Sequence, residues 1–160
     1  MSRLPAGHIS GVRAMSTIRD LSELTELVEK SGADLYVRWS RGPAVDLAKE
    51  GSRDELTHVR MPGLSANPLA IEPWWADRSP SLWVARRLYD YCHLREARGS
   101  DVRPWVLTGH VVGRGPDNEP LVRCREPIAW IAESVLRKAQ DLVDAEGVRD
   151  WGPLDRRNSR

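Results

Sequence analysis

The fold of this chain is decided by the stretch LYVRWSRGP, residues 35–43. Apolar and polar side chains alternate along it, which predicts a β-strand over residues 34–40 that ends at the Gly-Pro pair. The two faces of this strand would carry Leu35, Val37 and Trp39 on the apolar side and Tyr36, Arg38 and Ser40 on the other.

Two further tracts share this layout, PGLSANPL at residues 62–69 and GRGPDNEPLV at residues 113–122. Each joins an apolar run to a polar cluster punctuated by Gly and Pro, which is typical of a strand that delivers side chains to a site. We expect the remaining strands at residues 59–64, 105–112 and 121–124.

Apolar residues at helical spacing predict helices over residues 16–30, 79–97 and 127–145. Ser79-Pro80 is a strong start signal for the second helix, Pro127 is expected to open the third, and a short helix is expected from Pro43. Because strands and helices do not alternate strictly, the fold class is predicted to be α+β. We expect a small mixed or antiparallel sheet with two to four packed helices.

The chain has 160 residues and a mass of 18.1 kDa, which fits one domain. We expect a flexible arm at residues 1–15, a single domain at 16–152 and a flexible tail at 153–160. No apolar run approaches about 18 residues, and residues 1–15 lack the apolar core of a signal peptide. These features predict a cytoplasmic protein without a membrane partner.

The formal charge of +1 makes nucleic acid an unfavoured partner, because proteins that coat DNA or RNA are usually more basic. Cys92 and Cys124 are too few for a disulfide framework. The histidines have no metal-ligand spacing among themselves or with the cysteines, so we expect no metal. They are His58, His93 and His110.

Arg38 and Ser65 are the first candidate binding residues. A guanidinium at Arg38, beside Tyr36 on the same strand face, could hold a phosphate at two points or could pair with one of the many carboxylates. The Ser65 hydroxyl, at the end of a predicted strand, could orient a sugar or could close a local turn.

Asp117 and Glu119 are the candidate catalytic residues. Two residues apart on an extended segment, their carboxylates share one side of the chain. Paired acids suit stabilisation of a cationic transition state and removal of a proton from an acceptor. The alternative is a polar hairpin loop in which Asp117 shapes the turn.

Trp74 and Trp75 lie in an irregular stretch, residues 65–79. Long irregular segments in a compact domain are often functional. The two indole rings could stack a nicotinamide, a base or a peptide side chain, or they could pin the loop to the core.

The strings at residues 35–42, 63–69, 83–91 and 113–122 resemble an uncharacterised actinobacterial protein family. This resemblance covers most of residues 30–135. It implies membership of a family of unknown function and carries no activity to this chain.

The order Arg38, Ser65, Glu119 also resembles the Arg–Ser–Glu set of the ADP-ribosyltransferase-like fold. That resemblance implies NAD as cofactor, with Arg38 on its phosphate or ribose and Ser65 on the nicotinamide ribose. It implies that Glu119 holds the ribose 2′-hydroxyl and stabilises the oxocarbenium ion. Asp117 stands where that family has Glu or Gln and would help to activate the acceptor, while Tyr36, Trp74 and Trp75 would add cofactor contacts.

Two functions therefore remain open. One is an NAD-dependent enzyme that transfers ADP-ribose to an acceptor or hydrolyses NAD. The other is a non-catalytic protein-interaction or regulatory module that uses the loop rich in Trp and Pro. The sequence leaves both the acceptor or protein partner and the oligomeric state undetermined.

Overall fold

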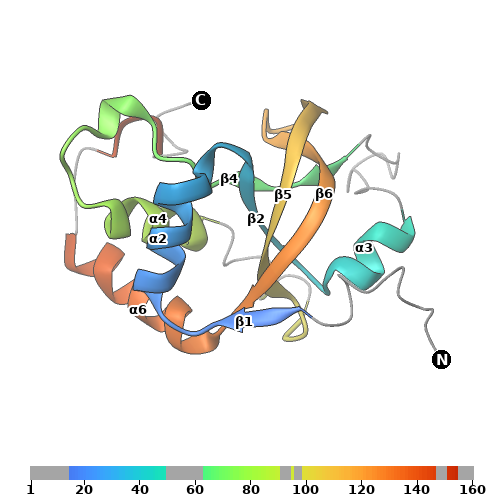
Figure 1. Ribbon diagram of the computed structural model, residues 1–160, viewed down its shortest axis with the longest axis horizontal. Coiled ribbons are helices and arrows are strands. Elements are labelled where there is room, and N and C mark those ends of the chain that lie inside the picture. Colours follow the sequence, from blue (N-terminus) through green and yellow to red (C-terminus); the bar gives the residue numbers. More distant parts are fainter. Residues whose placement is uncertain (1–14, 50–62, 91–94, 96–98, 147–150, 155–160) are drawn as a thin grey trace.

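A computed structural model describes residues 15–49, 63–90, 95, 99–146 and 151–154 (Figure 1). A curled β-sheet lies beside a layer of helices, and one further helix covers the far end of the sheet. The predicted α+β class is confirmed. In chain order the elements are β1 (Ser16–Ile18), α2 (Leu21–Ser31), η2 (Gly32–Asp34), β2 (Leu35–Ser40), α3 (Pro43–Lys49), β3 (Leu64–Ser65), β4 (Asn67–Pro68), η3 (Pro73–Trp75), α4 (Pro80–Tyr89), β5 (Arg103–Arg114), β6 (Pro120–Ile131), α6 (Glu133–Glu146) and η4 (Gly152–Leu154).

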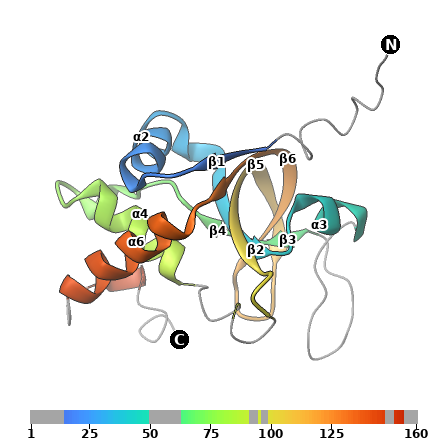
Figure 2. The same cartoon turned by 90° about the horizontal axis from the view of Figure 1, so that it is seen from below.

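The sheet runs in the order β1-β6-β5-β2-β4, and β3 pairs with β6. Only Ala66 separates β3 from β4, so residues 64–68 pair with β6 on one side and with β2 on the other. This short segment closes the sheet on itself, and Figure 2 shows the resulting curl of β5 and β6. All pairings are antiparallel except that of β1 with β6.

The long hairpin of β5 and β6 produces the curl. Its register shifts at three places, between Val106 and Leu107, between Thr108 and Gly109, and between Val111 and Gly113. Such bulges increase strand twist. Gly109 has no side chain at a point where a Cβ would collide with the carbonyl oxygen of Arg123, so the two strands approach closely there.

Strand β2 is buried on both faces. Leu35 and Val37 face the core shared with the helices. Tyr36 faces a second core inside the curl, which also contains Leu64, Ala66, Trp105, Leu107 and Val122. The predicted alternation of this strand is therefore confirmed, and each face serves a different core.

The predicted start of α4 is also confirmed. Ser79 caps the helix by accepting a hydrogen bond from the Leu82 amide at 3.2 Å, and Pro80 follows at the first helical position. The helix runs to Tyr89 and Arg95 is again helical, while most of the predicted segment beyond Tyr89 lies outside the described residues.

Two predicted helix starts are wrong. Residues 16–18 form β1, because they pair in parallel with β6 from Ala129 to Ile131, and α2 begins only at Leu21. Pro127 belongs to β6, where it lies at a register shift opposite Leu107. A bulge tolerates the missing amide hydrogen of proline, so the strand continues through it and α6 begins at Glu133.

Parts of three predicted segments lie outside the described residues. They are residues 1–14 of the predicted arm, most of the predicted strand at 59–64, and residues 155–160 of the predicted tail. Pro153 and Leu154, assigned to the tail from sequence, form part of η4, and Leu154 is buried. Across the described part of the chain, none of the helices has the length and apolar character needed to cross a bilayer.

Candidate functional site

Arg38 lies inside the curled sheet, paired with Asp46 of α3. Its Nε donates to Asp46 Oδ2 at 2.6 Å and its Nη2 donates to Asp46 Oδ1 at 3.3 Å. The exposed fractions of the two side chains are 10% and 9%. This two-point geometry is the strongest form of an arginine–carboxylate pair. The salt bridge considered from sequence is therefore present, with Asp46 as the partner.

Ser40 extends this pair into a buried network. Its hydroxyl donates to Asp46 Oδ2 at 2.5 Å and accepts from the indole N–H of Trp105 at 2.8 Å. The amide of Gly42 donates to the same hydroxyl at 3.1 Å. Each polar group therefore has a partner in the apolar interior, as burial requires. The network fixes α3 against the end of the sheet.

The fold brings Ser65 to Arg38 and brings the Glu119 segment beside Ser65. Arg38 Nη1 donates to the carbonyl oxygen of Ser65 at 2.8 Å. Ser65 pairs with Leu121, two residues beyond Glu119. The backbone therefore gathers the three predicted positions at one edge of the curl. The contact between the first two uses the main chain of Ser65.

Glu119 shapes its own turn. Its Oε1 accepts from the Asp117 amide at 2.9 Å, and its carboxylate lies against Gly115. Asn118 adopts a positive φ of 63°, which suits the tip of a hairpin. The Asp117 side chain is exposed. This arrangement is that of the polar hairpin loop considered from sequence.

Tyr36 faces the second core, on the same side of β2 as Arg38. Burial is the main factor that raises the pKa of its phenol, and the negative charge of Asp34 adds to the rise. The positive charges of Arg114 and Arg125 act in the opposite direction. The phenol is thus held in its neutral form.

Trp74 and Trp75 lie on the other side of β2. Trp75 is fully buried in the core that contains Leu35, and its ring stacks on Trp151 with a centroid separation of 6.2 Å. Trp74 is 37% exposed and donates its indole N–H to Glu72 at 2.8 Å. The structure therefore separates this pair from Arg38 and uses Trp75 to pin the loop to the core.

A separate cavity of about 150 Å³ lies between β2, α4 and α6. The helical and strand periodicity predicts several of its apolar lining residues as inward-facing, but no sequence signal singles out its charged ones, Arg95, Glu133 and Arg137. The lining residues come from segments far apart in the chain, so no local pattern indicates the cavity itself. They are Trp39, Leu88, Tyr89, Arg95, Glu133, Leu136, Arg137, Ala139 and Gln140.

Comparison with known protein families gives one match, a family described as of unknown function and named DUF6098, over residues 11–152. The chain belongs to the DUF6098 family. The expectation of a family without an assigned activity is thereby confirmed. No curated protein and no solved structure matches this DUF6098 chain.

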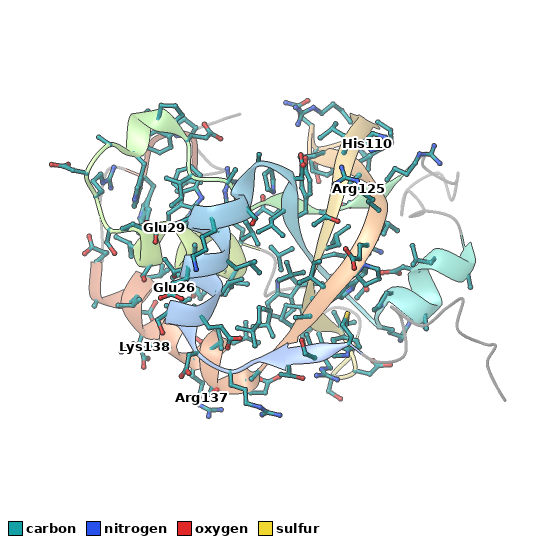
Figure 3. The ribbon with its side chains drawn as sticks, in the orientation of Figure 1. Glu26, Glu29, His110, Arg125, Arg137 and Lys138 are labelled. Carbon is teal, nitrogen blue, oxygen red and sulfur yellow. The ribbon has the colours of Figure 1, made fainter. Side chains whose placement is uncertain are left out.

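Metal ligands do not gather in the described part of this DUF6098 chain, where no group of three or more His, Cys, Asp or Glu side chains could hold an ion. His110 is exposed on β5, near one end of the sheet in Figure 3. His58 and His93 lie outside the described residues.

In this DUF6098 domain the Arg38 guanidinium uses all three nitrogens. Nε and Nη2 serve Asp46, and Nη1 serves Ser65. The arrangement joins β2, α3 and β3 at one end of the curl. Its chemistry, as the structure presents it, is that of a buried structural ion pair.

Proposed function

We propose that this DUF6098 chain is a non-catalytic interaction module that binds a cytoplasmic partner protein through α3. The observation that carries the proposal is the orientation of this helix. Its acidic residue, Asp46, is buried, while Val45 and Leu47 are 36% and 38% exposed. Ala44 and Ala48 are exposed as well.

This orientation differs from that of an ordinary surface helix, because the charged side chain is buried while Val45 and Leu47 keep more than a third of their surface exposed. The pairing of Asp46 with Arg38 holds α3 in place, so the helix cannot rotate without breaking a buried ion pair. The exposed part of these apolar side chains favours association, because contact with another apolar surface removes it from water.

The loop rich in Trp and Pro at residues 65–79, which the sequence favours as the binding surface, is less suited than α3 to contact a partner protein. Trp74 already packs at ring edges against Trp75 and Trp83, with centroid separations of 5.7 and 5.6 Å. This loop also lies at the opposite end of the molecule from α3 in Figure 1. We therefore place the partner on α3.

The partner chemistry follows from the composition of this face. A short apolar helix suits an apolar groove on the partner. Seven residues span only about 10 Å, and stable interfaces bury about 800 Å² per partner, so neighbouring surface must contribute. Because the contact is apolar, we expect binding that changes little with salt.

The test is substitution of Leu47 by Asp, with Val111→Asp as a matched control. Val111 is 42% exposed on β5, outside α3. Quantitative mass spectrometry of proteins cross-linked to the chain in host cells should find a partner that is lost in Leu47→Asp and kept in Val111→Asp. Identical capture by both variants, with melting temperatures unchanged, would contradict α3 as the contact. If the partner is a second copy of this chain, light scattering detects it as a doubled molar mass.

A second candidate is the NAD-dependent transferase or hydrolase. The observation that favours it is the gathering of Arg38, Ser65 and the Glu119 segment at one edge of the curl. In this function Arg38 would bind NAD, Ser65 would orient its ribose and Glu119 would stabilise the oxocarbenium ion. NAD would have to draw Arg38 away from Asp46, which is a substantial cost.

The discriminating measurement is the melting temperature with millimolar NAD, together with an assay of nicotinamide release. A ligand that binds only the folded state raises the melting temperature. The enzyme function requires this rise, and it requires nicotinamide release that is lost in Glu119→Gln. An unchanged melting temperature and no release favour the interaction module.

A further inference from the structure

The cavity between the sheet and the helical layer has an apolar floor. Trp39, Leu88 and Ala139 line it and are 4%, 0% and 1% exposed, and Leu136 completes it. The indole N–H of Trp39 already donates to the Leu88 carbonyl oxygen at 3.2 Å. The floor therefore has no unmet indole donor, and the half-buried Leu136 supplies its most accessible carbon surface.

The polar side of the cavity contains a closed ion pair. Arg95 contacts both oxygens of Glu133, at 3.0 Å from Nη1 and 2.7 Å from Nη2. Arg95 Nε donates to the Val102 carbonyl oxygen at 2.9 Å, and its guanidinium lies 5.4 Å from the centre of the Trp39 ring. The carboxylate of Glu133 is thereby neutralised and held to one side of the cavity.

Arginine side chains surround the carboxyl of Glu133. Three arginines act on this carboxyl and lower its pKa, first Arg95 through its hydrogen bond, then Arg103 and Arg137 through their charges. Within the described residues the side chain of Arg137 takes part in no hydrogen bond or ion pair, and it lies at the exposed rim of the cavity.

We infer that this cavity binds a small apolar carboxylate of about the size of phenylacetate. The ring would lie on the floor formed by Leu88, Leu136 and Ala139. The carboxylate would lie at the rim against Arg137, with the Gln140 amide beside it. The planar guanidinium fork matches the two oxygens of a carboxylate.

Size and polarity select this ligand class. A cavity of about 150 Å³ is known to hold a benzene ring, which leaves the acidic group at the mouth. Inorganic phosphate could meet Arg137 at the rim but would cover no carbon on the apolar floor, so it gains nothing from that part of the cavity. A dinucleotide is far larger than this cavity, so the inference is independent of both functions proposed above.

The experiment is a titration of the full chain with phenylacetate. Binding is monitored through the methyl NMR signals of Leu136 and Ala139. Arg137→Ala is the test variant, and Lys138→Ala, the neighbouring exposed cation on α6, is the matched control. We expect saturable shifts in the wild type, about tenfold weaker binding in Arg137→Ala and unchanged binding in Lys138→Ala.

Two further probes separate charge from shape. The neutral isostere phenylacetamide and inorganic phosphate should each fail to produce the shifts. The inference is overturned if phenylacetate leaves the methyl signals unchanged, if phenylacetamide binds equally well, if phosphate displaces phenylacetate, or if Arg137→Ala binds as the wild type does. Both variants change exposed side chains, so the fold is retained for the comparison.

Discussion

Arg38 and Asp46 form a two-point ion pair within the curled sheet, with Nε–Oδ2 at 2.6 Å and Nη2–Oδ1 at 3.3 Å. The pair joins the middle of β2 to a helix that begins three residues after that strand ends. Because the carbonyl of Ser65 accepts from the same guanidinium, one side chain connects three separate elements.

Removal of one member of this pair should destabilise the fold strongly. Asp46→Ala leaves a buried guanidinium without its counter-charge, and we expect a loss of about 3–5 kcal/mol in the free energy of unfolding. Urea denaturation measures it. The matched control is Asp101→Ala, which removes the exposed partner of Arg41 and should leave the midpoint unchanged. Equal effects of the two substitutions would contradict a structural role for the buried pair.

The two adjacent tryptophans should differ sharply in their contribution to stability. Trp75→Ala empties a fully buried site and should cost about 3–5 kcal/mol. Trp74→Ala removes mainly edge contacts with Trp75 and Trp83 and should cost about 0.5–1.5 kcal/mol. Thermal and urea unfolding of both variants check this order. A larger loss of stability for Trp74→Ala would contradict Trp75 as the main contact between the loop and the core.

Glu133 should contribute stability that is lost in acid. The Arg95 hydrogen bond holds the pKa of this carboxyl below its ordinary value. A lowered folded-state pKa means that the contribution is complete above the unfolded-state value of about 4.3 and is lost as pH falls through the folded-state pKa. We therefore expect Glu133→Gln to be less stable than the wild type at neutral pH, and the two stability curves to converge in acid. Urea midpoints across this range test it, and parallel curves would be the contrary result.

Cys124 should be a slow nucleophile in the folded protein. Burial raises the pKa of its thiol to about 11, and the negative charges of Glu126 and Asp46 add to the effect. Since the thiolate is the reactive form, alkylation by iodoacetamide at neutral pH should be much slower in buffer than in urea. Mass spectrometry of the Cys124 peptide measures the two rates, and equal rates would show an accessible thiolate.

Local sequence signals placed several elements correctly. The alternation in β2 and the Ser79-Pro80 start of α4 depend on neighbours within four residues, and both are present in the structure. The helices predicted from residues 16–18 and from Pro127 are wrong, because pairing with β6 and a bulge opposite Leu107 decide the conformation there. Those partners are distant in sequence, so helical periodicity alone could not predict them.

The candidate site also has one part that the sequence predicts and one part that only the tertiary structure decides. Residue order alone predicts that Arg38 is a polar side chain on a strand face, with either a phosphate or a carboxylate as its partner. Only the closure of the sheet by residues 64–68 and the placement of α3 made that partner Asp46. The alternation of apolar and polar residues is a property of a single strand, so the sequence determines it locally. The partner of an ion pair depends on which elements the folded chain packs together. Charge pairing acts over a few ångströms in space, whatever the separation of the two residues in sequence.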